Sequence, residues 1–280
     1  NNDKFLRLWN EVSINKLSLN LLQPVKTTCW IPYNKGGSYR KWYGNRFFIV
    51  DWRDNGANIK NYKGASFRNP AYQLREGGTF SALSSALLSA RITEQGFAFD
   101  SKGTMFFSKN ELDRVLAFLN SKVCSTMLLI LCPTLDFRFG TIQKLPIIIK
   151  GEVDIKGLIS ISKYDWDSRE TSWDFFKNEL LRIGGQTIEE SYELFKQHMK
   201  IKFTQLHKLE ERINQQFINL YEFQNEITQD IPLEDITILQ DELDRKALAK
   251  LNKKLVRDPE THEVLNYNEI ELPFIPQEIM

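Results

Sequence analysis

The fold class of the second half of the chain is decided by residues 188–220, which read IEESYELFKQHMKIKFTQLHKLEERINQQFINL. Apolar residues recur along this stretch with a mean interval of about 3.6 residues, the period of an α-helix. Thr187 precedes it as a predicted N-cap, and Glu190 stands at the capping-box position. We expect a helix of about 38 residues, roughly 57 Å long at ~1.5 Å per residue. Such a length is typical of a helical spacer or a coiled-coil-like arm.

Further helices are predicted on both sides of this stretch. Downstream, Leu239–Leu255 has an amphipathic pattern that predicts a second helix, and the proline-punctuated tail after it predicts irregular chain. Upstream, apolar residues recur at helical spacing after a plausible N-cap at Asn110, or at Ser108 just before it. A separate helix is expected over Ser125–Leu131, because Pro133 would stop it.

The first half of the chain also carries strand signals. Asn45–Trp52 is a short β-rich apolar run, and the turn sequence Arg53–Gly56 follows it. Gly96–Ser108 holds two aromatic-rich runs separated by a polar turn, which predicts a β-hairpin. The expected fold class is therefore α+β, with a mixed α/β domain followed by a mainly α-helical region that contains a long helix.

Length and composition indicate a two-domain globular protein. At about 150 residues per domain, 280 residues predict a basic α/β domain over residues 1–150 and an acidic helical region over residues 151–280. The longest apolar run, Met127–Cys132, is far short of the ~20 residues of a membrane span, so no membrane partner is expected. Three cysteines exclude a disulfide framework and favour a reducing, cytoplasmic setting. The first residue is not Met, which favours a piece of a longer chain.

The net charge of +1 conceals a large asymmetry between the two halves. Residues 1–150 hold 21 Lys and Arg against 10 Asp and Glu, which gives +11. Residues 151–280 hold 16 basic and 26 acidic residues, which gives −10. A basic half favours contact with a polyanion such as nucleic acid. The alternative is that the two halves attract each other, so that the charges are neutralised inside the molecule.

Basic residues interleaved with aromatic residues are concentrated in KGGSYRKWYGNR, residues 35–46, and in the 30 residues after it. Lysine and arginine bind phosphates, arginine also reads guanine edges, and aromatic rings stack on bases. The alternative is a solvated basic face over an aromatic core. The candidate DNA-binding residues are Lys35, Tyr39, Arg40, Lys41, Trp42, Arg46, Arg53, Lys60, Lys63, Arg68 and Arg75.

Signals for a catalytic, cofactor or metal site are weak. The chain contains no G-x-G-x-x-G, P-loop or G-x-S-x-G sequence, and no cysteine pair has metal-ligand spacing. Cys124 and Cys132 are expected to be small core residues. His198 and His207 lie nine residues apart, about 180° around a helix, and are expected to be solvated. We therefore predict no catalytic, cofactor-binding or metal-binding residues.

One short sequence is close to a known catalytic motif. Asn69-Pro70-Ala71-Tyr72 is similar to the N-P-P-Y of amino-group DNA methyltransferases, which binds the target amine and stacks on the flipped base. Here alanine replaces the second proline, and the preceding residues 64–68 are not an apolar strand. We expect a turn or surface loop at this position.

Several segments taken together resemble one protein family. They include KGGSYRKWYGN, REGGTFSAL, DWDSRETSWDF and LEERINQQFINLYEFQNEI, and they span roughly residues 35–237. They resemble the C-terminal part of large adenine-specific DNA methyltransferases of the phage-growth-limitation type, which belong to BREX phage-defence systems. Relatives occur among fused restriction-modification enzymes. The segment PTLDFRFGTIQKLPI, after NSKV, is also similar to the end of target recognition domains in type I specificity subunits.

The resemblance implies a domain layout and partners. In this family an N-terminal domain binds S-adenosylmethionine and methylates adenine N6, and a target recognition domain with helical regions follows. The chain matches the second part, which implies a fragment that binds double-stranded DNA and positions a separate methyltransferase domain, without a cofactor of its own. Other defence-system subunits are possible partners. The alternative is a protein-interaction scaffold that does not contact DNA.

Overall fold

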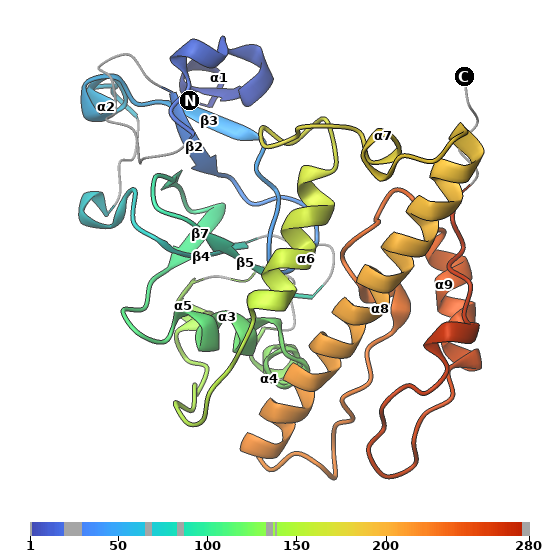
Figure 1. The fold of residues 1–280 in the computed structure, drawn as a ribbon. Coiled ribbons are helices and arrows are strands. Elements are labelled where there is room, and N and C mark those ends of the chain that lie inside the picture. The colour runs from blue at the N-terminus through green and yellow to red at the C-terminus, as the bar shows by residue number, and fades with distance from the viewer. Residues whose placement is uncertain are drawn as a thin grey trace.

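The computed structural model describes residues 2–19, 30–64, 69–82, 87–132, 137 and 139–275. Figure 1 shows two small β-sheets on one side of the molecule, α8 (Ile188–Leu220) and α9 (Arg245–Leu251) on the other, and α6 (Lys156–Asp167) between them. The expected α+β class with a long helix is confirmed. No single described helix is long and apolar enough to cross a membrane; α3 (Leu112–Asn120) and α4 (Lys122–Leu131) pass that test only together, bent by 67°.

The strands form two sheets within the described residues. The first has the order β1-β3-β2-β6 and is antiparallel except for the β2–β6 pair. The second has the antiparallel order β5-β4-β7. The strand bounds are β1 Leu6–Leu8, β2 Trp30–Asn34, β3 Phe48–Asp51, β4 Gly77–Ser81, β5 Ala90–Thr93, β6 Ala98–Phe99 and β7 Gly103–Phe106.

The strand expected over Asn45–Trp52 is present as β3, but the hairpin expected over Gly96–Ser108 is wrong. Asp100 forms the predicted turn, because its Oδ1 accepts hydrogen bonds from the backbone N–H groups of Lys102 and Gly103. The two strands that flank this turn pair with different sheets, β6 with β2 and β7 with β4. A turn sequence between aromatic runs does not fix which neighbour each strand pairs with.

Most of the residues in the described α-helices lie in the second half of the chain. Both helices expected between residues 110 and 131 are present, as α3 and α4. The helix predicted over Leu239–Leu255 is shorter in the structure. It is α9 (Arg245–Leu251), which has seven residues, and a 3-10 turn over Asn252–Lys254 follows it. The remaining helices are α1 Asn2–Phe5, α2 Arg53–Lys60, α5 Phe139–Ile142, α6 Lys156–Asp167, α7 Glu179–Ile183, α8 Ile188–Leu220 and α9 Arg245–Leu251.

The long helix α8 packs into the molecule instead of forming an arm. It has 33 residues and begins at the predicted cap, because Oγ1 of Thr187 accepts a hydrogen bond from the N–H of Glu190. Its apolar stripe is buried in the main core, with Met199, Phe203 and Phe217 at 1% exposure or less. It contacts α4, α6 and α7. The expected coiled-coil-like arm is therefore wrong, the helix itself is confirmed, and the spacer role stays a prediction.

The main hydrophobic core crosses the boundary predicted at residue 150. One cluster of buried side chains extends from Trp42 and Phe80 in the first half to Leu248 in α9. A smaller cluster lies around the first sheet and includes Phe5 and Trp52. The division into two domains stays a prediction, but the two halves share one core.

Candidate nucleic-acid interface

The stretch predicted to contact nucleic acid, residues 35–46, lies largely between the two halves of the molecule. Trp42 has φ 68°, a left-handed conformation that is uncommon for a bulky side chain. Two backbone hydrogen bonds hold it there: its N–H donates to the Ala90 carbonyl, and its carbonyl accepts from the N–H of Ile92. The stretch is therefore fixed along β5 and faces the helices.

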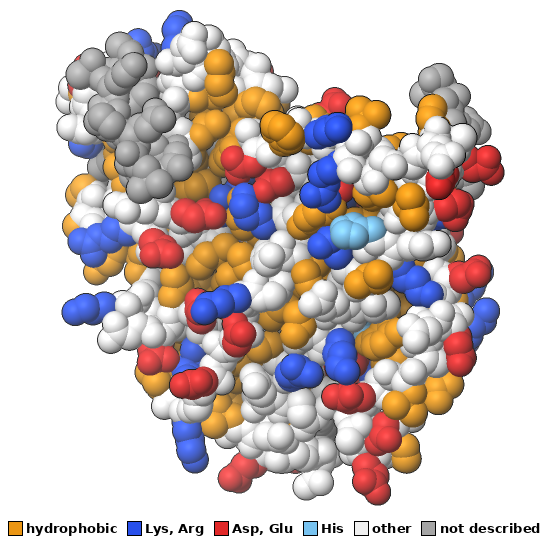
Figure 2. Space-filling view, viewed as in Figure 1, with side chains coloured by type: hydrophobic (Ala, Val, Ile, Leu, Met, Phe, Trp, Pro, Cys, Tyr) orange, Lys and Arg blue, Asp and Glu red, His pale blue; other side chains and the backbone are white. Residues whose placement is uncertain are grey.

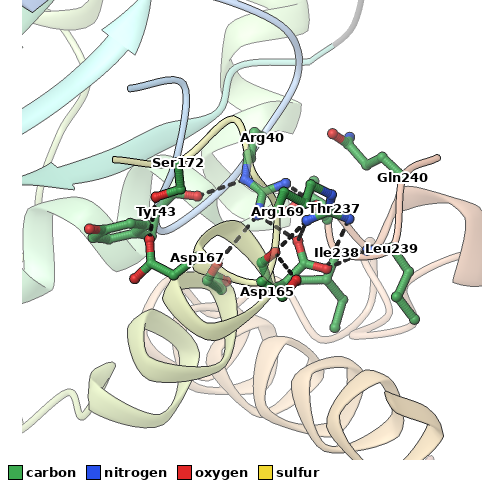
Figure 3. Close-up of polar contacts among 12 residues, drawn as sticks. Arg40, Tyr43, Asp165, Asp167, Arg169, Ser172, Thr237, Ile238, Leu239 and Gln240 are labelled. Carbon is green, nitrogen blue, oxygen red and sulfur yellow. Dashed lines mark hydrogen bonds and ion pairs between the residues drawn. The ribbon is translucent and has the colours of Figure 1, made fainter. Parts of the chain in front are cut away.

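Arg40 is 3% exposed and is enclosed by groups from the second half of the chain. Figure 3 shows its guanidinium between α6 and the segment around Thr237. Its Nη2 lies 2.7 Å from Oδ2 of Asp165, and its Nη1 donates to the Thr237 carbonyl. Its Nε donates to the backbone carbonyl of Tyr43 at 2.8 Å. The donors of Arg40 are thus used inside the protein.

Lys41 and Trp42 share a single buried carboxylate. Nζ of Lys41 lies 2.7 Å from Oε2 of Glu210 on α8. Nε1 of Trp42 donates to Oε1 of the same carboxylate at 2.7 Å. Burial alone would lower the pKa of Lys41, but Glu210 outweighs burial and raises that pKa. Lys41 is therefore charged and neutralised inside the molecule.

Arg46 and Tyr39 are also engaged internally. The buried guanidinium of Arg46 pairs with Glu94 and lies 3.7 Å from the centre of the Tyr43 ring. Tyr39 is half-buried, and its carbonyl accepts a hydrogen bond from Nε2 of Gln240 at 2.9 Å. Burial raises the pKa of the Tyr39 hydroxyl. The side chains of Arg40, Lys41, Trp42 and Arg46 are thus buried and paired inside the protein, and DNA binding by these residues stays a prediction.

Asp165 is the centre of the largest polar network at this junction. It pairs with Arg40 and also with Arg169, which in turn pairs with Glu242 at 2.8 Å. Its Oδ1 accepts a hydrogen bond from the N–H of Leu239. Burial would raise the pKa of Asp165, but Arg169 and Arg40 hold it below its ordinary value. The pairs Arg40–Asp165 and Lys41–Glu210 neutralise two cations of the basic half with carboxylates of the acidic half, so part of the charge asymmetry is internal, as the alternative interpretation expected.

The other candidate residues remain at the surface or lie outside the described chain. Arg53 is half-exposed and pairs with Asp51. Arg75 is exposed and stacks on Tyr72, which is 46% exposed. Lys35 is half-buried over the Phe48 ring. Lys60 and Lys63 are exposed at the end of α2, and Arg68 lies outside the described residues.

A second group of cations, which the sequence did not single out, lies on the opposite half of the chain. We call it the α7–α8 cluster: Tyr164 from α6, Glu179 and Arg182 from α7, and His198 and Lys202 from α8. Cζ of Arg182 lies 4.5 Å from the Tyr164 ring centre, and Nζ of Lys202 lies 3.9 Å from it. The His198 ring centre lies 5.5 Å from that of Tyr164.

Glu179 is the carboxylate of the α7–α8 cluster. It is buried, and its Oε2 accepts hydrogen bonds from the Tyr164 hydroxyl and from Nη2 of Arg182. Burial raises the pKa of Glu179, and Lys202 opposes that effect. Nζ of Lys202 has no carboxylate within ion-pair distance in the described chain. His198 and Lys202 are one helical turn apart, but no sequence pattern indicates that Tyr164 and Arg182 join them.

The two histidines of α8 differ from the expectation. His207 is fully buried: its Nδ1 contacts the Tyr267 hydroxyl at 2.5 Å and its Nε2 contacts the Ile231 carbonyl at 2.8 Å. The expectation that it is solvated is wrong for His207. His198 is half-buried, and its Nε2 is buried without a hydrogen-bond partner in the described residues. Cys124 and Cys132 are buried core residues, as expected.

The near-motif at residues 69–72 forms a surface turn, as expected. Pro70–Tyr72 is a 3-10 turn, and the Tyr72 ring packs on Phe107, with the two ring centres 5.1 Å apart. The described residues do not fit an S-adenosylmethionine site, because none of their glycine pairs joins a strand to the start of a helix. Gly77 and Gly78 lie inside β4, packed against Phe106. The described residues also contain no group of three or more His, Cys, Asp or Glu that could hold a metal ion.

Comparison with known proteins identifies relatives over nearly the whole chain. No protein-family model matches it. It is 36% identical over 269 residues, 89% of the chain, to the adenine-specific methyltransferase PglX of Lacticaseibacillus casei (strain Zhang). It is 33% identical over 275 residues, 95% of the chain, to the adenine-specific methyltransferase BrxX of Escherichia coli O9:H4 (strain HS). The chain is thus related, along nearly its full length, to a segment that makes up about a fifth (22%) of these PglX- and BrxX-type adenine-specific methyltransferases.

Proposed function

We propose that the chain is the DNA target recognition part of an adenine-specific methyltransferase of a phage-defence system. It binds double-stranded DNA and positions a separate methyltransferase domain, which binds S-adenosylmethionine and transfers the methyl group to adenine N6. The observation that carries the proposal is the similarity of nearly the whole chain to two adenine-specific methyltransferases. An enzyme that modifies a base inside a duplex requires a surface that holds the surrounding DNA.

The internal ion pairs support a positioning role. Asp165 and Glu210 lie on helices of the second half, and they hold Arg40 and Lys41 of the first half at 2.7 Å. A rigid junction lets DNA held by one half be oriented relative to a domain attached to the other. We infer that the α/β part and the helical part move as one body on the DNA.

The first test is DNA binding by the 280-residue chain. Fluorescence anisotropy of a labelled random duplex is measured at about 50 and about 200 mM salt. Several phosphate contacts predict a loss of affinity of roughly 10³-fold or more over that range. Absence of binding at about 50 mM salt would contradict a DNA-contacting role for this chain.

Two exposed candidates separate surface contact from internal pairing. We expect Arg75→Met and Lys63→Met each to reduce the salt slope by about one if each side chain contacts a phosphate. Both side chains are exposed, so the unfolding midpoint in urea should change little. If both variants kept the wild-type salt dependence of DNA affinity, the DNA would not contact the face that carries Arg75 and Lys63.

A protein-interaction scaffold is the second candidate function. The observation that favours it is the end of α4, where Leu129, Ile130 and Leu131 are 61%, 79% and 46% exposed. Adjacent exposed apolar side chains are typical of protein contact surfaces. Replacing Ile130 with Ser should leave DNA binding unchanged under the first proposal. Loss of complex formation with a purified methyltransferase domain in Ile130→Ser, together with no DNA binding by the wild-type chain, would support the second.

A further inference from the structure

The α7–α8 cluster has more positive charge than its own acidic group can neutralise. Arg182 and Lys202 carry two positive charges, and Glu179 is the carboxylate they face. Its Oε2 already accepts hydrogen bonds from Tyr164 and Arg182. Figure 2 shows Lys and Arg side chains gathered beside a histidine over the N-terminal half of α8, on a face open to solvent. This face therefore has a local surplus of about one positive charge.

The positively charged side chains of the α7–α8 cluster lower the pKa of Lys202 and of His198. Burial and the neighbouring Arg182 lower the pKa of Lys202, and Glu179 only partly offsets them. Burial, Lys202 and Arg182 also lower the pKa of His198. A site where cations lower one another's pKa has a positive potential, and an anion bound there removes the penalty.

The geometry leaves donors available for an anion. Nε and Nη2 of Arg182 donate hydrogen bonds to Oε2 of Glu179, and Nη1 has no hydrogen-bond partner among the described residues. Nζ of Lys202 lies over the Tyr164 ring and donates to no described oxygen. Nε2 of His198 is buried beside them and has no hydrogen-bond partner among the described residues, so a ligand or water that satisfied it would be favoured.

We propose that the α7–α8 cluster binds a backbone phosphate of double-stranded DNA, with Lys202 and Arg182 as its charged donors. A phosphodiester carries one negative charge, which matches the surplus of the cluster. The proposal rests on the proposed function and assigns part of its DNA surface to the acidic half of the chain. The DNA then lies along α7 and the N-terminal half of α8.

The test uses the 280-residue chain and a labelled random duplex in anisotropy titrations over a series of salt concentrations. The main variant is Lys202→Met, which keeps the apolar stem and leaves no carboxylate without its ion-pair partner. We expect affinity to fall roughly 5- to 10-fold at about 100 mM salt and the salt slope to fall by about one. Lys202→Arg keeps the charge and should retain both values to within about twofold.

The matched control is Lys250→Met on α9, an exposed lysine for which the described structure records no partner. It removes the same charge and should change affinity by less than about twofold. Urea unfolding of every variant separates lost binding from lost folding. A second readout is the NMR signal of the His198 ring, which should shift when the duplex is added but not when sodium chloride is added to equal ionic strength.

The outcomes distinguish the two proposals. If the wild-type chain binds no duplex at about 50 mM salt, the proposed function itself fails. If the wild-type chain binds, but Lys202→Met keeps the wild-type affinity and slope, the phosphate site is overturned and the proposed function stands. If Lys250→Met weakens binding as much as Lys202→Met does, the effect is one of net charge, and the assignment to this cluster is also overturned.

Discussion

Arg40 and Lys41 each face a buried carboxylate on the other half of the chain, whereas Arg182 and Lys202 face one carboxylate between them. The first pair belongs to the most basic stretch of the sequence, and the second to the acidic half. Arg40 pairs with Asp165 and Lys41 with Glu210, each at 2.7 Å. The number of positive residues in a stretch of sequence therefore does not show where the positive surface of the folded protein lies. The positions of the neutralising carboxylates show it.

The difference between the two regions predicts opposite consequences of mutation. A buried pair that loses one partner leaves an uncompensated charge in a poorly solvated place, which costs about 3–5 kcal/mol. Removing an exposed or half-exposed cation that has no carboxylate of its own changes the free energy of unfolding little. The buried junction should therefore control folding, and the α7–α8 cluster should control binding.

The largest effect is expected for Asp165→Asn. This change leaves Arg40 and Arg169 without their shared carboxylate, so we expect the free energy of unfolding to fall by about 3–5 kcal/mol. Urea unfolding followed by far-ultraviolet circular dichroism measures the loss. Asp167→Asn on the same helix is the control: its partner Lys163 is 43% exposed, so a loss of under about 1 kcal/mol is expected. Equal losses in the two variants would contradict a special role for the buried network.

The next effect isolates the charge of Lys41. Glu210→Gln keeps an oxygen acceptor for Nε1 of Trp42 but removes the charge that neutralises Lys41. We expect unfolding free energy to fall by about 3 kcal/mol. Adding Lys41→Met should recover more than half of that loss, because the buried charge is then absent. A double variant as unstable as Glu210→Gln alone would show that hydrogen bonding, and not charge, holds this junction.

The pH dependence of stability should follow the same network. The pKa of Asp165 is lower in the folded state than its ordinary value of 3.8, so its contribution to stability is present above about pH 4. That contribution is lost as the pH falls through the folded-state pKa. The stability difference between wild type and Asp165→Asn should therefore be constant from about pH 7 to pH 5 and shrink below pH 4. A difference that grows with acidification would reverse the assigned sign.

The local elements of this fold could be predicted from the sequence. The period of the stretch after Thr187 gives α8 and its cap, and the run before Arg53 gives β3. The pairing of strands could not, because β6 and β7 flank a hairpin-like turn yet pair in different sheets. The packing of α8 was also missed, since amphipathic periodicity shows which face is buried but not what covers it.

The candidate site shows the same limit. Residue type and spacing identified Lys41 as a cation near aromatic rings, but its partner Glu210 is 169 positions away. The α7–α8 cluster is assembled from three helices; helical spacing relates Glu179 to Arg182 and His198 to Lys202, but nothing in the sequence brings the two pairs together. Burial and the pairing of charges follow from tertiary contacts, so residue type and spacing alone could not show which cations are buried.

The smallest effect on stability is expected for Lys202→Met, and it gives the sharpest contrast with the buried junction. Burial and Arg182 lower the pKa of Lys202, which means that the folded protein disfavours its charge. Removing that charge while keeping the apolar stem should change the free energy of unfolding by no more than about 0.5 kcal/mol, with any change toward greater stability. Lys41→Met is the matched comparison, since it leaves Glu210 buried without its cation and should be strongly destabilising. Urea unfolding of the two lysine variants side by side measures the contrast. If Lys202→Met were as destabilising as Lys41→Met, Lys202 would be a structural cation like those of the basic stretch, and the distinction between the two regions would fail.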